Sequence, residues 1–174
     1  SFVRYKEVAG TDMAPAESVP PTTRARSLSF TFDSASTMWK INGKTYSPLA
    51  YEFGEDIDPA QNTKLGDTEI WTLINADNAS QVPHPFHQHL VEFQILDVCP
   101  TNNPGCGTPP VASQQGWKDT VLVMPLTIVR VKMNFYFNGP ETPASVFPGD
   151  GFVFHCHTLE HEDHQMMLQQ KISP

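Results

Sequence analysis

Apolar and polar residues alternate most regularly between Val129 and Phe137. Apolar side chains take every second position there, and the positions between them include Arg130, Lys132 and Asn134. Because successive side chains of a β-strand point to opposite faces, this pattern predicts a strand with one buried face. A helix would instead need apolar residues three and four positions apart.

Short strand-like segments recur along most of the chain, separated by loops rich in proline and glycine. Besides 129–137, the expected strands are 27–33, 68–75, 90–98, 151–155 and 166–172. Residues 39–46 have the pattern of a hairpin around Asn42 and Gly43. Many short strands, together with 16 prolines that limit helix formation, predict an all-β sandwich or barrel.

The length of 174 residues suits one domain with a substantial core. Residues 1–26 contain several prolines and no sustained periodicity, so we expect an extended linker or a segment crossing from a preceding domain. The domain itself is expected to occupy residues 27–174. No signal peptide is visible, but the chain does not begin with methionine, so this carries little weight.

The net charge of the chain limits the classes of partner that it is expected to bind. A net charge of −8 and a pI near 5.2 argue against binding to nucleic acid or to an anionic membrane surface. No run of about 18 apolar residues is present, so we expect no membrane span. Cys99 and Cys106 flank a turn-rich loop and predict a disulfide, and with it an extracytoplasmic location, although two free thiols remain the alternative.

All seven histidines fall in two clusters. The first holds His84, His87 and His89, and the second runs from His155 to His164 around Cys156. At the end of a strand, His155 and His157 should share one face while Cys156 points to the other. Two metal sites could therefore lie on opposite faces, one using the thiolate of Cys156 and the other the imidazoles of His155 and His157. His87 and His89 are also two residues apart and could contribute to the second site.

The Cys156 face can complete a copper site. His161 and Met166 follow Cys156 by five and ten residues, so a short loop could return both, and His84 would supply a second imidazole. Two histidines and a cysteine with a weak axial methionine are the ligands of blue copper sites. Structural zinc sites usually contain two or more closely spaced cysteines, a pattern that is missing here.

The two clusters together resemble the C-terminal cupredoxin domain of a multicopper oxidase, in particular bacterial spore-coat laccases, bilirubin oxidase and cuprous oxidases. The motifs are His-Pro-Phe-His-Gln-His from His84 and His-Cys-His-Thr-Leu-Glu-His-Glu-Asp-His-Gln-Met-Met from His155, and residues 116–121 are also similar to that family. The resemblance covers roughly residues 27–172. It implies a cupredoxin-like Greek-key β-barrel or sandwich.

The resemblance also implies a role for each motif residue. The type 1 copper would take His84, Cys156, His161 and the axial Met166; the type 2 copper His87; and the type 3 pair His89, His155 and His157. Glu162 matches the acidic residue that delivers protons to reduced oxygen, although a solvated loop carboxylate is the simpler interpretation. His164 matches no ligand, and Met167 is expected in the core.

The implied activity is that of a laccase-like enzyme. A small reducing substrate would lose electrons near His161, these would pass through Cys156 to His155 and His157, and O2 would be reduced to water. The family's trinuclear cluster uses eight histidines, whereas this chain offers four. We therefore expect an N-terminal cupredoxin domain, on the same precursor or on a second chain, to supply the others, and the chain alone to be inactive.

Two other functions were weighed. A stand-alone blue copper electron-transfer protein would need His84, Cys156, His161 and Met166 but has no use for the remaining clustered histidines. Copper nitrite reductase resembles the same fold, but its cysteine is not flanked by histidines on both sides. Phenols, bilirubin, aminophenols and metal ions all remain candidate substrates.

Overall fold

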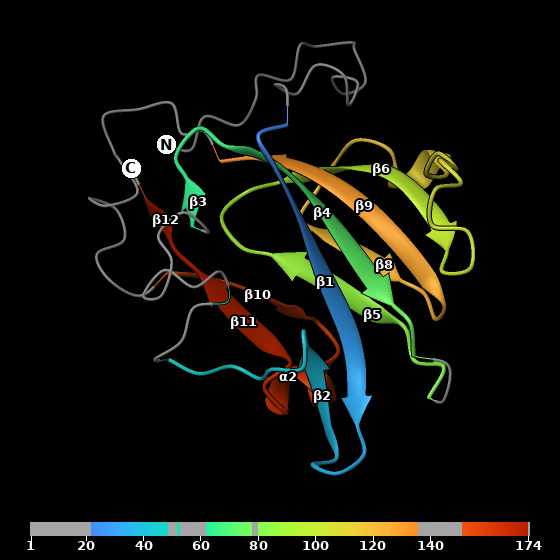
Figure 1. Ribbon diagram of the computed structural model, residues 1–174, viewed down its shortest axis with the longest axis vertical. Coiled ribbons are helices and arrows are strands. Elements are labelled where there is room, and N and C mark those ends of the chain that lie inside the picture. The colour runs from blue at the N-terminus through green and yellow to red at the C-terminus, as the bar shows by residue number, and fades with distance from the viewer. Residues whose placement is uncertain (1–21, 49–51, 53–61, 78–79, 136–150, 174) are drawn as a thin grey trace.

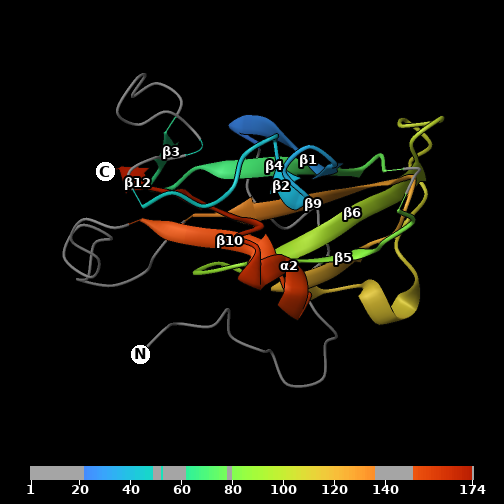
Figure 2. The ribbon, with the colours of Figure 1, turned by 90° about the horizontal axis from the view of Figure 1, so that it is seen from below.

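The computed structural model describes residues 22–48, 52, 62–77, 80–135 and 151–173 (Figure 1). It contains two main sheets and a small two-stranded one. The six-stranded sheet has the order β2-β1-β4-β9-β6-β7, and the four-stranded sheet has the order β11-β10-β5-β8. Seen from below, β5 and β10 form a layer separate from β1 and β4, as Figure 2 shows. The expected all-β sandwich is confirmed.

The strands have the following bounds: β1 Arg24–Asp33, β2 Met38–Ile41, β3 Thr63–Lys64, β4 Thr68–Asn75, β5 His84–Gln88, β6 Phe93–Pro100, β7 Trp117–Lys118, β8 Thr120–Val123, β9 Thr127–Asn134, β10 Phe152–Cys156, β11 Met167–Gln170 and β12 Ile172–Ser173. Two short helices accompany them, the 3-10 helix η3 Ala112–Gln114 and α2 Leu159–Asp163. Strand β1 pairs parallel with β4 and β12 with β3, whereas the other pairings are antiparallel.

The core lies between the facing sides of the two main sheets. Trp71 of β4 is fully buried, and its ring centroid lies 5.1 Å from that of Phe154 of β10 and 6.3 Å from that of Phe86 of β5. The predicted alternation of β9 is also observed, because Val129, Val131 and other apolar residues of that face are buried. Burial of these large rings is the main stabilising contribution to a sandwich of this kind.

Each predicted strand overlaps a strand of the structure, mostly with different ends, whereas β3 and β5 were not predicted. The expected strand 68–75 coincides with β4, whereas β1 begins at Arg24, three residues before the expected start. Asn42 and Gly43 both have positive φ, and Ile41 and Lys44 exchange backbone hydrogen bonds, as the predicted tight turn requires. Residues 1–21 lie outside the described residues, so the boundary between linker and domain stays a prediction.

Residues 116–121 form two strands in two different sheets. Strand β7 pairs with β6 in the six-stranded sheet, whereas β8 pairs with β5 in the four-stranded sheet. The chain changes sheets at Asp119, between Lys118 and Thr120. This crossing leaves the backbone carbonyl of Asp119 beside β5, where it accepts a hydrogen bond from the backbone N–H of Gln88 at 3.0 Å.

The predicted bond between Cys99 and Cys106 is present, with the two Cα atoms 5.7 Å apart. It ties the end of β6 to the loop that follows and confirms the disulfide interpretation over two free thiols. Cys156 is therefore the one free cysteine. Within the described part of the chain, no helix has both the length and the apolar character needed to cross a bilayer.

Candidate metal centre

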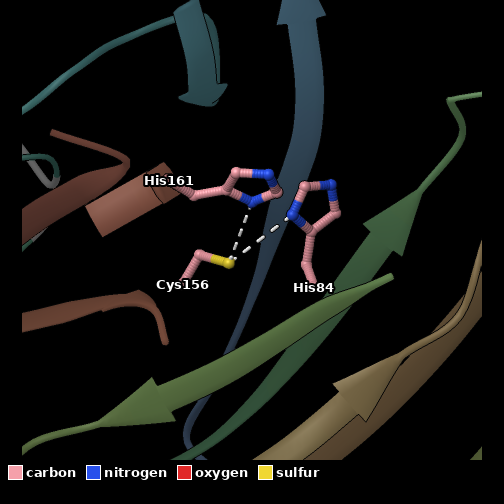
Figure 3. A group of neighbouring side chains, drawn as sticks. All are labelled: His84, Cys156 and His161. Atoms are coloured by element: carbon pink, nitrogen blue, oxygen red, sulfur yellow. Dashed lines mark hydrogen bonds between the residues drawn. The ribbon is translucent and has the colours of Figure 1, made fainter. Parts of the chain in front are cut away.

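Three potential metal ligands meet inside the sandwich, at the end where β5 begins and β10 ends. The Sγ atom of Cys156 lies 3.6 Å from Nδ1 of His84 and 3.4 Å from Nδ1 of His161, as Figure 3 shows. One donor atom from each residue lies within 4.8 Å of the other two, and all three residues are buried. We call these three residues the interior triad.

The alternation of two neighbouring strands explains this placement. Strands β5 and β10 are antiparallel partners, with Cys156 opposite Phe86 and His155 opposite His87. His84, Phe86 and Cys156 all face the core. His87 and His155 must therefore face outward, which confirms the expectation that Cys156 and the paired histidines use opposite faces.

A short helix, which the sequence did not predict, returns the chain to Cys156. In α2, the backbone N–H of His161 donates to the carbonyl of Thr158 at 3.0 Å. The helix ends at Asp163, Gln165 has a positive φ, and the backbone N–H of Cys156 donates to the carbonyl of the next residue, Met166, at 3.1 Å. The Met166 side chain is fully buried in the same apolar cluster as Cys156.

Burial controls the protonation of the interior triad. It lowers the pKa of His84 to about 4, with a further lowering by His161 and a smaller raising effect from Asp77. Burial also lowers the pKa of His161 and raises the pKa of the Cys156 thiol. Both imidazoles are thus neutral at pH 7, the form that binds metal ions, whereas the thiol must lose its proton to become a ligand.

A second group of histidines lies on the outward face of β5 and β10, and we call it the outer cluster. Donor atoms of His87, His89 and His155 lie within 4.8 Å of one another, and the Nε2 atoms of His89 and His155 are 3.1 Å apart. His157 completes the cluster, with its ring centroid 5.0 Å from that of His155 and 5.3 Å from that of His87. Its side chain is 55% exposed.

Four contacts orient the outer cluster. The Nδ1 atom of His87 lies 2.9 Å from the carbonyl oxygen of Asp119 and 3.0 Å from the Thr120 hydroxyl. The carboxylate of Glu162 lies 3.6 Å from Nδ1 of both His155 and His157. These contacts favour protonated Nδ1 atoms, so the Nε2 atoms are left as metal donors.

Burial and mutual repulsion favour the neutral form of two imidazoles in the outer cluster, those of His89 and His155. Burial is the main cause that lowers the pKa of His89 and of His155, and neighbouring imidazoles lower both further. Glu162 partly opposes this effect at both residues. Neutral imidazoles packed this closely are suited to share metal ions and poorly suited to carry protons.

The structure brings together every residue predicted for the two sites. His164 is in neither donor group among the described residues. Sequence reasoning missed the carbonyl of Asp119, because any residue type could supply it, and the rings of Phe30 and Trp39 that pack against His84. The missing information was the packing of β2 against β5 and α2, which brings Trp39 beside the histidines.

The donor chemistry fits copper. A thiolate and two imidazoles form a soft, nitrogen- and sulfur-rich set, and Met166 adds a buried thioether beside it. Hard cations such as Mg²⁺ and Ca²⁺ prefer oxygen ligands, which this interior site lacks among the described residues.

Comparison with known proteins supports the same metal. The family model for multicopper oxidases matches residues 19–174. The laccase of Bacillus subtilis is 36% identical over 128 residues, which cover 67% of this chain and 22% of that protein. Bilirubin oxidase from Albifimbria verrucaria is 33% identical over 138 residues, which cover 79% of this chain and 20% of that protein.

Solved structures of multicopper oxidases also match this chain. A laccase-like multicopper oxidase from Ochrobactrum sp. superposes with a TM-score of 0.63 at 26% identity, covering 98% of this chain and 34% of that one. Laccase from Pediococcus acidilactici superposes with a TM-score of 0.68 at 25% identity, covering 94% and 30%. The chain thus spans about a fifth of these curated relatives and about a third of these solved chains. The expected cupredoxin fold is confirmed, and the chain belongs to the multicopper oxidase family.

Proposed function

We propose that the chain is the C-terminal part of a laccase-like oxidase that couples one-electron oxidation of a small substrate to the reduction of O2 to water. The arrangement of β5 and β10 is the observation that carries this proposal. His84 and Cys156 lie on one face of these two strands, His87 and His155 lie on the other, and Cys156 follows His155 directly in the chain. Such an arrangement suits an enzyme in which two metal sites must exchange electrons.

The proposed ligands divide between two sites. His84, Cys156 and His161, with Met166 as a weak axial ligand, would hold a type 1 copper. His87 would hold a type 2 copper, and His89, His155 and His157 would contribute to a type 3 pair. When bound, the copper ions supply the one-electron redox chemistry and the reduction of O2 that no side chain can provide.

The chain's own residues position the metals and handle protons. Glu162 lies within 3.6 Å of two histidines of the outer cluster and is one-third exposed, so its carboxylate can take a proton from water and hold it beside the cluster. His161 is 6% exposed, Leu159 of the same short helix is exposed, and a reducing substrate would bind at the surface above His161. The resemblance to laccases and bilirubin oxidase favours an aromatic reductant such as a phenol or bilirubin.

The outer cluster needs a partner. Its four imidazoles face outward from the sheet and include the half-exposed His157. An N-terminal cupredoxin domain, on the same precursor or as a second chain, would supply the opposing histidines. The disulfide between Cys99 and Cys106 supports an extracytoplasmic location for the assembled enzyme.

A stand-alone blue copper electron-transfer protein is the alternative, because the interior triad with Met166 would be sufficient for it. The outer cluster argues against this function. The Asp119 carbonyl and the Glu162 carboxylate orient imidazoles that a simple electron carrier would not use.

The outer cluster can be tested by substitution in a longer form of the protein that carries an N-terminal cupredoxin domain. His155→Ala should retain the blue absorption of the interior site and lose oxygen consumption with a phenolic substrate. His164→Ala is the matched control, since His164 lies outside both donor groups, and it should retain both properties. Undiminished oxygen consumption by His155→Ala would leave the electron carrier as the better account.

A further inference from the structure

The hairpin of β1 and β2 presents an apolar face to the interior triad. Phe32 pairs with Trp39 across the two strands, and Phe30 pairs with Ile41. Since residues two apart on a strand share a face, these four side chains lie on one side of the hairpin. Figure 3 shows the blue β1 and the teal β2 beside the imidazoles of His84 and His161.

Trp39 contacts both imidazoles. Its ring centroid lies 4.6 Å from that of His161, with the planes 33° apart, and 4.8 Å from that of His84, where the contact is edge-on. The two imidazole centroids are themselves 5.0 Å apart. Trp39 is 9% exposed and His161 is 6% exposed, so the indole forms part of the cover between these rings and solvent.

The His84 ring is held by packing where a hydrogen bond would be usual. A metal-binding histidine normally donates its second ring N–H to a carbonyl or carboxylate, which fixes the orientation of the ring. Nε2 of His84 is buried, and no hydrogen-bond partner for it is found among the described residues. The rings of Trp39 and Phe30, at 4.8 and 5.5 Å, are the contacts that restrain His84 instead.

We propose that Trp39 is a positioning residue for the interior copper site. Its indole fixes the planes of the His84 and His161 rings together and excludes water from the space around the Cys156 sulfur. The proposal rests on the proposed function only in requiring that the interior triad binds copper. The hydrophobic surroundings and orienting contacts of such ligands control their metal affinity and the reduction potential of the site.

Loss of the Trp39 indole should change the reduction potential of the copper in one direction. Water admitted to the site favours the more highly charged Cu(II) over Cu(I), so loss of the indole should lower the reduction potential. A freely rotating His161 or His84 ring should also broaden the spectrum of the site and weaken copper binding. Losses of orienting contacts around metal ligands commonly cost roughly 10–100-fold in affinity.

The test compares three variants of the copper-loaded chain by absorption, electron paramagnetic resonance, redox titration and the rate of copper release to a chelator. Trp39→Leu keeps an apolar side chain but removes the aromatic plane, and we expect an altered spectrum, a lower potential and copper release faster by roughly 10–100-fold. Trp39→Phe should restore most of the original behaviour. Phe32→Ala is the matched control, because Phe32 contacts Trp39 at 5.0 Å and is 42% exposed.

A Trp39→Leu variant whose spectrum, potential and copper release all equal those of the original chain would overturn the proposal. So would equal effects of Trp39→Leu and Phe32→Ala, because they would point to general loosening of the hairpin. Thermal unfolding of each variant identifies misfolding, and Trp39→Phe keeps the test decisive if Trp39→Leu does not fold. Failure of the oxidase proposal would give a different result. The chain would still be blue, but forms that also carry an N-terminal cupredoxin domain would consume no O2.

Discussion

The interior triad and the outer cluster both lie around β5 and β10, with His161 of the triad supplied by α2, yet they differ in donor chemistry and in exposure. The triad is buried, contains the thiol of Cys156 and is covered by rings that belong to this chain. The outer cluster contains imidazoles only, includes the exposed His89 and the half-exposed His157, and faces away from the core. Strand alternation alone separates the two chemistries.

The comparison shows which part of the function is complete. Every ligand proposed for the interior copper comes from this chain and is already buried beside the others. The outer cluster is oriented by Asp119 and Glu162 but has no opposing ligands among the described residues. Under the proposed function, this chain would supply a whole one-electron site, whereas O2 reduction would need a second surface.

The largest expected effect comes from substituting Cys156, because this removes a ligand of the interior triad and none of the outer cluster. Cys156→Ser removes the thiolate on which the blue absorption depends, so the variant should lose this absorption and all oxidation of reducing substrates. His89→Ala, on the opposite face, should remain blue. Absorption spectra of both copper-loaded variants measure this, and a blue and active Cys156→Ser variant would end the assignment.

Substitution of Glu162 tests whether its carboxylate supplies protons to the outer cluster. In a form that reduces O2, Glu162→Gln keeps the size of the side chain but cannot hold an exchangeable proton. We expect oxygen reduction to slow by roughly 10²–10⁴-fold while reduction of the interior copper by substrate is nearly unchanged. Stopped-flow measurement of the two half-reactions distinguishes them, and equal slowing of both, or of neither, contradicts a proton role.

The protonation of the interior triad gives a prediction for the metal-free chain. The folded-state pKa of His84 is about 4, below its ordinary value of 6.5. The unfolded chain therefore binds a proton first as the pH falls, so stability present above pH 6.5 is lost progressively towards pH 4. The loss from His84 is at most about 3 kcal/mol.

Denaturant unfolding between pH 7.5 and 4 measures this effect, with His84→Gln as the comparison. As the pH falls, the free energy of unfolding of the original chain should decrease more than that of His84→Gln. A difference that is independent of pH would mean that His84 is accessible to protons in the folded chain.

The smallest effect concerns Met166, the proposed axial ligand. Met166→Leu preserves the apolar volume but removes the weak thioether, so the site should stay blue and its reduction potential should rise. A redox titration of the copper-loaded chain measures the change. An unchanged potential would show that Met166 packs beside the copper without binding it.

The sequence could predict the features that depend on local spacing, whereas His84, 72 residues from Cys156, lies in a separate histidine cluster. His155, Cys156 and His157 owe their opposite directions to strand alternation, and Cys99 and Cys106 are close enough in the chain for the disulfide to be expected. The strand ends and the contacts between distant segments could not be predicted in the same way. The contact of Trp39 with His161 depends on how the β1–β2 hairpin lies against α2, which no local pattern encodes.

The short helix α2 was missed for a similar reason. Five residues are too few to show a helical period, and Glu160, Glu162 and Asp163 read equally well as a solvated loop. The consequence for the site was small, because a short loop had been expected to return His161 and Met166. The consequence for Glu162 was larger, since the helix holds its carboxylate beside two histidines.

Copper counting on the isolated chain, combined with oxygen uptake in the presence of a phenolic substrate, tests the central claim most directly. Under the proposed function, the interior triad with Met166 is a complete copper site and the outer cluster is half of a second site. The chain should therefore bind about one copper tightly, show the blue absorption that depends on Cys156, and consume little or no O2. Four tightly bound coppers per chain, or sustained reduction of O2 to water without a partner domain, would contradict this account.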